Sequence, residues 1–522
     1  MSGSMSSRGV LVGLDVGTNG ARAVAVDLIG TVRADAAAGY PLMTPRAGWA
    51  EQHPQDWWRA CQKVLRELTS KIEDPVLGLG LTGQMHGSVF LDGSNKVIRP
   101  ALLWSDQRTA SQAEAITETV GATRLLEIAG NPASTGFQAP KILWLRDEEP
   151  NGYSRLKHVL LPKDYVRLQL TGEYATDVSD ASGTLLLDIQ RRKWSDELLA
   201  ALGIPAEWLP SVYEGPDSTG EVTAAAAAET GLSPGIPVAA GGGDNAAAAV
   251  GLGIIAEGAA SVSIGTSGVV FVDSGSRIHR GGQLHTFCHA VPGRYHVMGV
   301  TLAAGGSLGW WRDAVFPGRD FASLTAEAAQ IPPGAEGLLY FPYLSGERTP
   351  HRDPFARGGF LGLTTRHTAA HMTRAVMEGV GFSLKDCLDL IAASGVRVQK
   401  LRATGGGARS ELWRQLLADI LGLPVHRMLV DEGPAYGAAL LAGVAAGAFA
   451  DVSESSSVIR ERPEADLPNR DRARLYTSYH TVYKQFYPVA APLMHQLARL
   501  VSDEETAPAY REVRRIRGRA NE

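Results

Sequence analysis

The hydrophobic pattern at the start of the chain predicts a small antiparallel sheet. Two apolar runs, at residues 10–16 and 21–26, are joined by a glycine-containing turn, and a second turn near Gly30 leads into a third run. Residues 54–72 carry apolar side chains at helical spacing, and a short apolar strand at 76–81 follows. Strands and helices continue to alternate after this point. The pattern therefore predicts a mixed α/β fold.

The second half of the chain shows the same mixture of patterns. A long helix over 368–394 precedes a strand over 401–404, and two helices over 410–421 and 434–447 follow, the last rich in glycine and alanine. We place a domain boundary near 253–259. The expected parts are an N-terminal domain over 9–254, a C-terminal domain over 258–455, a closing helical segment over 456–500 and a tail over 501–522 whose arginines are solvated.

Two glycine-rich turns of closely similar sequence stand one domain length apart. Residues 13–20 and 261–268 both join two apolar runs through Gly-Thr-Asn/Ser-Gly, so the simplest interpretation is two similar domains. Glycine lets backbone N–H groups approach an anion, and Thr and Ser hydroxyls add donors. Asp15 precedes the first turn, whereas Ser263 stands at the equivalent position of the second. A single carboxylate beside two such turns suits Mg²⁺ and a nucleotide, which predicts a phosphoryl-transfer enzyme.

Two aspartates are candidates for the chemistry. Asp15 would hold Mg²⁺, directly or through water; the alternative is an aspartate that fixes its own turn by local hydrogen bonds. Asp244 follows the glycine run 241–243 at a predicted strand end, where small neighbours leave room for a substrate. Phosphoryl transfer to an alcohol needs a carboxylate that accepts the hydroxyl proton. The alternative for Asp244 is a cap of the helix that starts at 245–247.

Two further segments are candidates for binding. The glycines at 405–407 are expected to open a helix, so that their N–H groups and the helix dipole face a nucleoside or its phosphates. The alternative is a tight β–α turn. His86 follows Gln84 and Met85 on a loop at the end of the strand over 76–81. A lone histidine is most often structural, and substrate contact is the other interpretation.

Composition narrows the classes of function. The 522-residue chain suits two large domains, and its net charge of −5 gives no electrostatic reason to expect nucleic acid or an anionic membrane as a partner. The sequence has no Gly-Lys pair and hence no P-loop, so the hairpin turns must hold any nucleotide. Three scattered cysteines, Cys61, Cys288 and Cys387, are typical of reduced thiols. With no resemblance to a signal peptide and no long uncharged run, we expect a cytoplasmic protein.

Several longer motifs resemble the FGGY family of carbohydrate kinases. In chain order they are Gly83-Gln84-Met85-His86-Gly87, Leu103-Trp104-Ser105-Asp106-Gln107-Arg108, Leu161-Pro162-Lys163-Asp164-Tyr165, Gly241-Gly242-Gly243-Asp244-Asn245 and Tyr343-Leu344-Ser345-Gly346-Glu347-Arg348-Thr349-Pro350-His351. The resemblance covers residues 9 to about 490. The namesake region corresponds to 358–363, which does not keep the Phe-Gly-Gly-Tyr wording. Glycerol kinases carry a different polar sequence at 84–87, which favours a ketopentose over glycerol.

The resemblance implies two ribonuclease-H-like domains of the actin and sugar-kinase type, with sugar and ATP in the cleft between them. It implies that Asp244 is the general base and that Asp15 and Asp244 lie at the Mg²⁺ site. The implied sugar-binding residues are Gln84, Met85, His86, Trp104, Asp244 and Asn245. The implied nucleotide-binding residues are Gly17, Thr18, Asn19, Gly265, Thr266, Ser267, Gly405, Gly406 and Gly407. Asn19 stands where many members have Ser, and either side chain can serve as a polar loop residue.

The activity that the resemblance implies is transfer of a phosphoryl group from ATP to the C5 hydroxyl of D-xylulose. Ribulose, arabinitol or another ketopentose or pentitol remains open as the acceptor, since these differ in the configuration of one hydroxyl. The rival from another class is an actin-like or chaperone-type ATPase, against which the segment 84–87 and Asp244 argue. We expect no nucleic acid or membrane partner, and a homodimer by analogy only.

Overall fold

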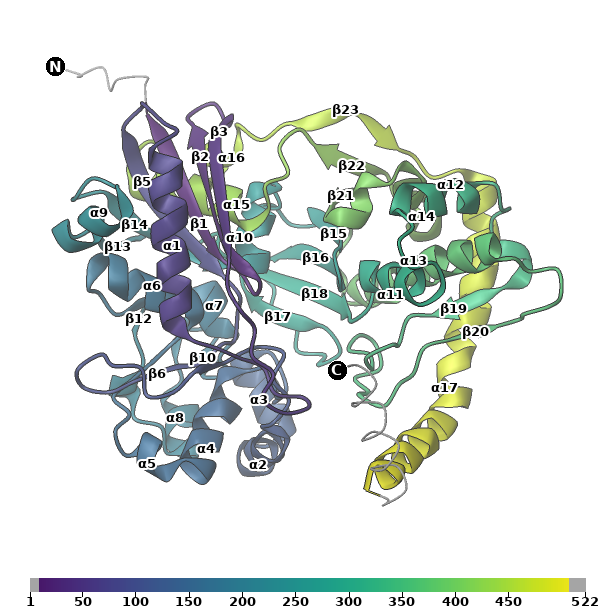
Figure 1. The fold of residues 1–522 in the computed structure, drawn as a ribbon, viewed down its shortest axis with the longest axis horizontal. Helices are drawn as coiled ribbons and strands as arrows, with labels where there is room; N and C mark the ends of the chain where they lie inside the picture. Colours follow the sequence, from purple (N-terminus) through teal and green to yellow (C-terminus); the bar gives the residue numbers. More distant parts are fainter. Residues whose placement is uncertain (1–8, 507–522) are drawn as a thin grey trace.

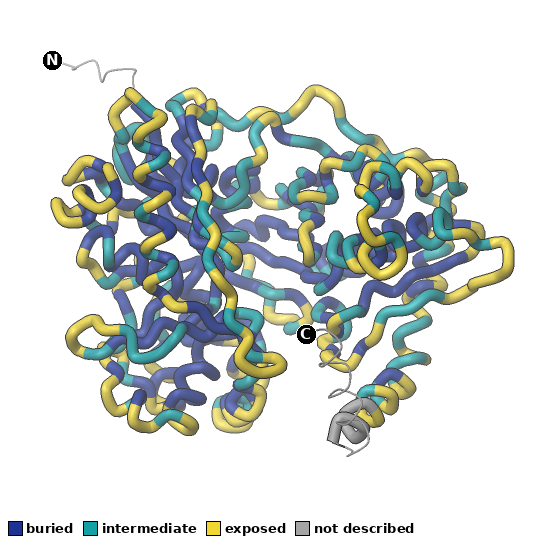
Figure 2. Tube along the Cα trace, viewed as in Figure 1, coloured by how far each residue is buried: buried dark blue, intermediate teal, exposed yellow. Residues whose placement is uncertain are grey.

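The structure is a computed structural model that describes residues 9–506, with side chains described up to residue 500. Two β-sheets, one from each half of the chain, form its centre, and helices flank both (Figure 1). The strands of both sheets are mostly buried (Figure 2). The tail arginines from 511 onward lie outside the described residues. Within 9–506, no helix combines the length and the apolar character that crossing a bilayer requires.

The N-terminal sheet has six strands. Their spatial order is β13 (Ser218–Glu221), β14 (Pro237–Gly243), β5 (Val76–Gly83), β1 (Val10–Val16), β2 (Gly20–Asp27) and β3 (Val32–Gly39). β1, β2 and β3 form the predicted antiparallel meander, while β5 runs parallel to both β1 and β14. Helix α1 (Pro54–Thr69) buries the apolar side chains that had predicted it, and it contacts β2 and β3. Antiparallel and parallel pairings thus meet in β1.

The C-terminal sheet has seven strands. Their order is β17 (His285–Cys288), β18 (Tyr295–Thr301), β16 (Gly268–Gly275), β15 (Ala260–Ile264), β21 (Leu401–Thr404), β22 (Val425–Met428) and β23 (Glu461–Asp466). The flanking helices are α11 (Gly305–Val315), α12 (Phe321–Ala329), α13 (Ala369–Ala393) and α14 (Glu411–Leu421). Helix α17 (Arg470–Thr506) runs down the outer edge (Figure 1). The expected closing helical segment over 456–500 is therefore helical only from Arg470, because residues 461–466 pair with β22 as strand β23. The second glycine-rich turn joins β15 to β16, as the first joins β1 to β2.

A lobe of smaller elements lies below the N-terminal sheet (Figure 1). Its helices are α2 (Ala110–Val120), α3 (Ala122–Ala129), α4 (Gln138–Glu148), α5 (Pro150–Tyr153) and α8 (Asp196–Leu202). One apolar cluster contains Phe137 and Leu186 from this part of the chain together with Phe271 and Phe287 from the C-terminal sheet. The two halves of the chain therefore share a buried core below the two sheets.

Short elements complete the fold. The helices are α6 (Pro162–Thr171), α7 (Val178–Ser182), α9 (Ala224–Thr230) and α16 (Val452–Ser456). The strands are β4 (Glu51–Gln52), β6 (Val89–Leu91), β7 (Ala101–Leu102), β8 (His158–Leu160), β9 (Ala175–Asp177), β10 (Leu187–Asp188), β11 (Lys193–Trp194), β12 (Ser211–Tyr213), β19 (Leu339–Phe341) and β20 (Gly359–Leu361).

Two helices pack against each other where the halves meet. Helix α15 (Gly433–Ala445) follows the C-terminal strands in sequence, yet it packs on β1 and β5 of the N-terminal sheet and on α10 (Asp244–Gly251). Glycines make this approach possible. A Cβ atom added at Gly13 would lie 1.8 Å from the carbonyl oxygen of Ala435, and one at Gly80 would lie 1.9 Å from that of Ala438. Backbone therefore touches backbone across this contact.

Candidate active site

The carboxyl ends of three parallel strands bring the first candidate residues together. Val16 of β1 pairs with Gly83 of β5, and Gly83 pairs with Gly243 of β14. Carboxyl ends of parallel strands meet at one edge of a sheet. Asp15 and Asp244, which are far apart in the sequence, consequently lie at the same edge.

The turn between β1 and β2 is fixed by two aromatic side chains. Tyr40 Oη donates a hydrogen bond to the carbonyl of Gly17. Trp104 Nε1 donates to Thr18 Oγ1 at 3.0 Å. Asn19, at the tip of the turn, is exposed. The predicted sugar residue Trp104 is thus tied directly to the predicted phosphate loop.

Gln84 supports this turn from inside the protein. Its side chain is buried, and Nε2 donates to Gln52 Oε1 at 3.0 Å and to the Gly17 carbonyl at 3.3 Å. Gln52 in turn donates to the carbonyl of Thr18 at 2.7 Å. The side-chain Nε2 of Gln84 therefore stabilises the turn, and Met85 follows Gln84 in the sequence.

The second turn is held by the start of helix α11. The carbonyl of Gly265 accepts a hydrogen bond from the amide of Gly305 at 2.7 Å, and that of Thr266 accepts one from Gly306 at 3.0 Å. The amide of Gly265 donates to the carbonyl of Ser267 at 3.0 Å, which closes the turn. Gly265 and Thr266 are exposed, so the outer side of the turn is open to a ligand.

The third glycine segment lies against the second turn. β15 and β21 are parallel, with Ser263 opposite Thr404. A Cβ atom at Gly405 would lie 2.8 Å from the carbonyl oxygen of Ile264, and Gly405 has φ +87°. A Cβ atom at Gly407 would lie 2.4 Å from Ile264 Cγ2. These positions require glycine because the two loops touch.

The glycines at 405–407 open a helix as expected, but only a short 3₁₀ helix and not α14. Residues 406–409 form a 3₁₀ turn, and α14 begins at Glu411. The residue that caps α14 is Ser410, whose Oγ accepts a hydrogen bond from the amide of Trp413. A serine side chain is a strong N-cap, so it fixes the helix start beyond the glycines. The positive end of the α14 dipole therefore lies at Ser410 and not at the glycines.

A small crevice opens between the two halves beside these loops. Its volume is about 10 Å³, which is room for one water molecule. It is lined by Ala248, Gly251, Leu252, Thr404, Val430, Asp431, Glu432, Gly433 and Tyr436. The helix that begins at Asp244 thus forms one wall, and the residue just before Gly405 belongs to the other. The crevice thus lies between the C-terminal part of α10 and the end of β21.

Asp244 is oriented by its neighbour. Asn245 donates to Asp244 Oδ1 from its amide at 2.7 Å and from Nδ2 at 2.9 Å. Among the described residues no hydrogen bond reaches Oδ2. The N-cap of α10 is Gly243 rather than Asp244, and the one first-turn amide that the Asp244 side chain accepts is that of Asn245. Burial raises the pKa of Asp244 to about 6, while the hydrogen bonds from Asn245 lower it.

Asp15 shares the electrostatic environment of Asp244. Burial, with a further contribution from the negative charge of Asp244, raises the pKa of Asp15 to about 7, although Arg22 acts in the opposite direction. Asp15 Oδ1 is buried and has no hydrogen-bond partner among the described residues. Two neighbouring carboxylates, one with an unpartnered oxygen, form a pair that a cation would stabilise.

Met85 and His86 lie just beyond the carboxyl end of β5, which pairs with the strand that leads to Asp244. His86 Nδ1 lies 2.7 Å from the carbonyl oxygen of Gly183, which can only accept, so Nδ1 carries the proton. Burial lowers the pKa of His86 to about 3, and the ring is neutral with Nε2 as an acceptor. Met85 is buried against Gly243, where an added Cβ would lie 2.8 Å from Met85 Cγ.

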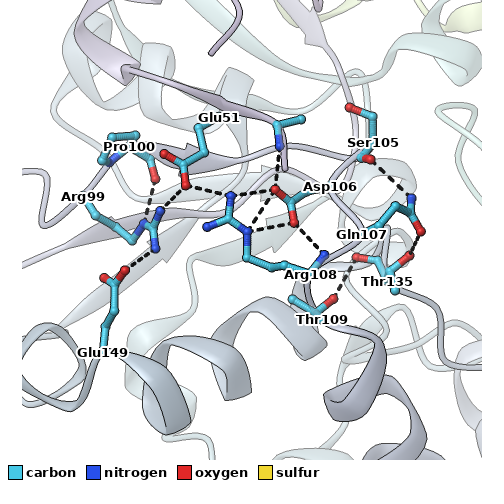
Figure 3. Close-up of polar contacts among 11 residues, drawn as sticks. Glu51, Arg99, Pro100, Ser105, Asp106, Gln107, Arg108, Thr109, Thr135 and Glu149 are labelled. Carbon is cyan, nitrogen blue, oxygen red and sulfur yellow. Dashed lines mark hydrogen bonds and ion pairs between the residues drawn. The ribbon is translucent and has the colours of Figure 1, made fainter. Parts of the chain in front are cut away.

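An ionic network holds the segment that carries Trp104 (Figure 3). Asp106 accepts hydrogen bonds from Arg108 and, at 2.7 Å, from the amide of Ala50. Arg108 also pairs with Glu51 at 2.7 Å, and Glu51 pairs with Arg99. These side chains are nearly all buried. Because each charge is paired, the network fixes the 103–108 motif rather than offering a ligand site.

Sequence reasoning assigned no role to two basic residues at this site. Lys141 Nζ donates to the carbonyls of His86 at 2.8 Å and Gly136 at 2.7 Å, and burial lowers its pKa to about 7. The sequence did contain a signal for Lys141, because it is the one charged residue in the largely apolar run 138–145. Arg348 lies with its guanidinium carbon 6.0 Å from the centre of the Trp104 ring. Its motif had been noticed, but nothing in the sequence showed which side chains it would reach.

Comparison with known proteins gives two family matches. The model of the N-terminal domain of the FGGY family of carbohydrate kinases matches residues 10–251, and that of the C-terminal domain matches residues 260–446. Xylulose kinase from Lactococcus lactis is 41% identical over 93% of this chain and 98% of its own length. Xylulose kinase from Escherichia coli is 41% identical over 92% of this chain and 99% of its own length.

Solved structures agree with these matches. A "xyloylose kinase" from Brucella ovis has a TM-score of 0.87 and 37% identity, covering 93% of this chain and 100% of its own. Ligand-bound xylulose kinase from Lactobacillus acidophilus has a TM-score of 0.88 and 26% identity, covering 94% and 99%. The predicted fold of two α/β domains of the sugar-kinase type is confirmed by this similarity.

Proposed function

The chain belongs to the FGGY family of carbohydrate kinases, as its motifs predicted, and we propose that it converts ATP and D-xylulose to ADP and D-xylulose 5-phosphate. The observation that carries the proposal is that the ends of β1, β5 and β14 bring Asp244 close to Asp15 and the first glycine-rich turn, while in the other half segment 405–407 lies against the second turn. The names of the relatives support the choice of sugar.

Asp244 is the general base in this proposal. A carboxyl group with a pKa of about 6 is mostly ionised at neutral pH and is a better proton acceptor than an ordinary aspartate. Asn245 occupies Oδ1, which leaves Oδ2 to take the proton of the C5 hydroxyl. As that proton leaves, the hydroxyl oxygen attacks the γ-phosphorus, the bond from phosphorus to the ADP oxygen breaks, and ADP departs. General-base assistance of this kind contributes on the order of 10²–10⁴ in rate.

The glycine segments hold the nucleotide. Turn 17–19, turn 265–267 and segment 405–407 present the hydroxyls of Thr18 and Thr266 to phosphate oxygens, together with the backbone amides other than those of Gly17 and Gly265, which close the turns. The turns come from different halves of the chain, so they act together only when the halves approach. We infer that sugar binding closes the crevice and excludes water as a competing acceptor.

Mg²⁺ fits the carboxylate pair at this site. Asp15 has a buried, unpartnered oxygen, and hard carboxylate oxygens suit this cation. Within the described residues no group of three or more acidic, histidine or cysteine side chains could cage a metal, so nucleotide phosphates would supply further ligands. Asp15 would hold the ion, with Asp244 beside it. When bound, Mg²⁺ would neutralise charge on the β- and γ-phosphates.

Sugar recognition falls to the residues in front of Asp244. The neutral His86 ring offers Nε2 as an acceptor for a sugar hydroxyl, and Met85 packs against Gly243. Asn245 and Trp104 border the same space. For Gln84 we propose a supporting role, because its amide is occupied by the loop that it holds. The buried free cysteines fit a cytoplasmic enzyme; a homodimer remains an expectation by analogy.

A substrate panel tests the proposal. ADP release is followed with D-xylulose, ribulose, arabinitol, glycerol and no acceptor, and the product is identified by ³¹P and ¹³C NMR. We expect D-xylulose to give the highest kcat/KM and phosphate on C5. A higher kcat/KM with ribulose or arabinitol would move the assignment to that sugar. Equal ADP release with and without sugar would instead favour an actin-like or chaperone-type ATPase.

A further inference from the structure

The backbone around Arg348 is firmly anchored to the C-terminal half. Glu347 is buried and accepts hydrogen bonds from Thr301 Oγ1 at 2.6 Å, from the amide of Leu302 at 3.0 Å and from the amide of Arg348 at 2.8 Å. On the other side, Thr349 exchanges two hydrogen bonds with Val300, at 3.0 and 3.1 Å. Both neighbours of Arg348 are therefore fixed to the end of β18.

The guanidinium group of Arg348, in contrast, has no fixed partner. Across the described residues it makes no hydrogen bond or ion pair, although the residue is half-buried. Glu347, the nearest acid, already accepts the three hydrogen bonds given above. A charged group that is desolvated without a partner is costly, and such groups normally find one. An anchored backbone with an unpartnered head is the arrangement expected of a ligand contact.

The guanidinium group of Arg348 lies beside residues of the N-terminal half. Its Cζ is 6.0 Å from the centre of the Trp104 ring. Its Nη2 is 3.8 Å from the position that a Cβ on Gly136 would take. Its positive charge lowers the pKa of His86, along with burial and Lys141. Arg348 thus extends from the C-terminal half to residues of the N-terminal half that border the sugar.

We propose that Arg348 is a substrate-contacting residue that binds oxygen atoms of the open-chain sugar from the C-terminal half. A guanidinium offers five N–H donors in a planar fork, which matches two oxygens on neighbouring carbons of a ketose or polyol. The residues that otherwise face the sugar all come from the N-terminal half. Arg348 therefore makes the sugar a bridge between the halves, and sugar binding favours the closed crevice. The inference rests on the proposed function and adds a specificity contact to it.

The test compares Arg348→Gln with Arg352→Gln. Arg352 is an exposed arginine four residues further along the same loop, and no acidic partner is recorded for its side chain within the described residues. The two variants remove the same charge from the same loop. The KM for sugar, the KM for ATP and kcat are measured for both, with thermal unfolding to verify folding. Sugar-free ATP hydrolysis is recorded as a separate readout.

We expect Arg348→Gln to raise the KM for D-xylulose by at least about tenfold, because a hydrogen bond from a charged donor is lost. Its KM for ATP and its sugar-free ATP hydrolysis should stay within about twofold of wild type, and Arg352→Gln should stay within about twofold throughout. A rise confined to the KM for ATP would assign Arg348 to the nucleotide phosphates and overturn the proposal. An equal rise in both variants would show a general charge effect and overturn it as well.

The two proposals fail in different ways. If wild-type enzyme prefers another pentulose or pentitol, the proposed substrate fails, and the variants are compared with the preferred sugar. If Arg348→Gln binds that sugar as wild type does, the arginine contact fails while the kinase assignment stands. Should Arg348→Gln unfold early, Arg348→Lys keeps the charge without the planar fork. A sugar KM for Arg348→Lys equal to that of wild type would then overturn the bidentate contact.

Discussion

For Gly437→Ala, helix propensity predicts a gain in stability, whereas the structure predicts a loss. It lies inside α15, facing α10, and a Cβ atom there would be 1.8 Å from the carbonyl oxygen of Ala247 and 2.8 Å from the amide nitrogen of Gly251. Replacing glycine by alanine in a helix interior ordinarily stabilises a protein by about 1 kcal/mol. Here the added methyl group would meet backbone atoms that cannot rotate away.

The size of the effect follows from the contact distance. Ordinary van der Waals contact begins at 3.4 Å, so α10 and α15 must separate by about 1.6 Å to admit the Cβ of Gly437→Ala. Overpacking costs about 1–3 kcal/mol, and we expect the upper end because the clash is with backbone. After the helix gain, a net loss of about 2 kcal/mol remains. Since α10 begins at Asp244, a shift of about 1 Å in the base should lower kcat on the order of 10²-fold.

The assay is urea unfolding of Gly437→Ala, wild type and Gly309→Ala, with kcat measured for the first two. Gly309 is also a helical glycine, in α11, but no atom lies within 4 Å of its Cβ position. Gly309→Ala should therefore show the ordinary stabilisation, while Gly437→Ala unfolds at lower urea. If both variants gained stability alike, the helices α10 and α15 would not be in backbone contact and the reasoning would be refuted.

Three further outcomes concern groups near the site. Ser179→Ala removes the hydroxyl that accepts a hydrogen bond from the amide of Gly243 at 3.1 Å, one residue before the base. This variant should lower kcat about tenfold, whereas the control Ser182→Ala, on the same helix, should not. Equal kcat values for the two variants would contradict this role of Ser179. Asp15→Asn should raise the Mg²⁺ concentration for half-maximal rate at least about tenfold, and an unchanged Mg²⁺ titration would exclude Asp15 as a ligand. Burial lowers the pKa of His289 to about 4. Below pH ~6.5 the imidazole is therefore protonated in the unfolded chain but stays neutral in the folded protein. Because protonation favours the unfolded chain, the free energy of unfolding falls as the pH drops from about 6.5 to 4. Between pH 6.5 and 4.5, the free energy of unfolding measured in urea should fall by about 2 kcal/mol less for His289→Gln than for wild type. Identical pH profiles would contradict a neutral, buried His289 ring.

Local patterns in the sequence were sufficient to predict the main elements. The apolar runs at 10–16 and 21–26 became β1 and β2, and the helical spacing over 54–72 became α1, because these signals are local. The start of α14 was predicted to within one residue, at 410 against the observed Glu411. Ser410 followed by Glu411 is a common helix start, and it outweighs the glycines before it.

Other features depend on tertiary contacts that no local pattern carries. The glycine- and alanine-rich helix over 434–447 was predicted, but not its place on the N-terminal sheet, since only the pairing with Gly13 and Gly80 fixes it. The buried orientation of the Gln84 side chain depends on its hydrogen bond to Gln52, which lies in another part of the sequence. The unpartnered head of Arg348 likewise depends on which groups surround it after folding.

The most direct test of the central claim is the kcat of Asp244→Asn with D-xylulose. The substitution keeps the shape of the side chain and removes its ability to accept the C5 proton. We predict that kcat falls on the order of 10²–10⁴-fold while ATP and D-xylulose still bind, as measured by calorimetry. A variant that keeps more than about a tenth of wild-type kcat would contradict the assignment of Asp244 as the base.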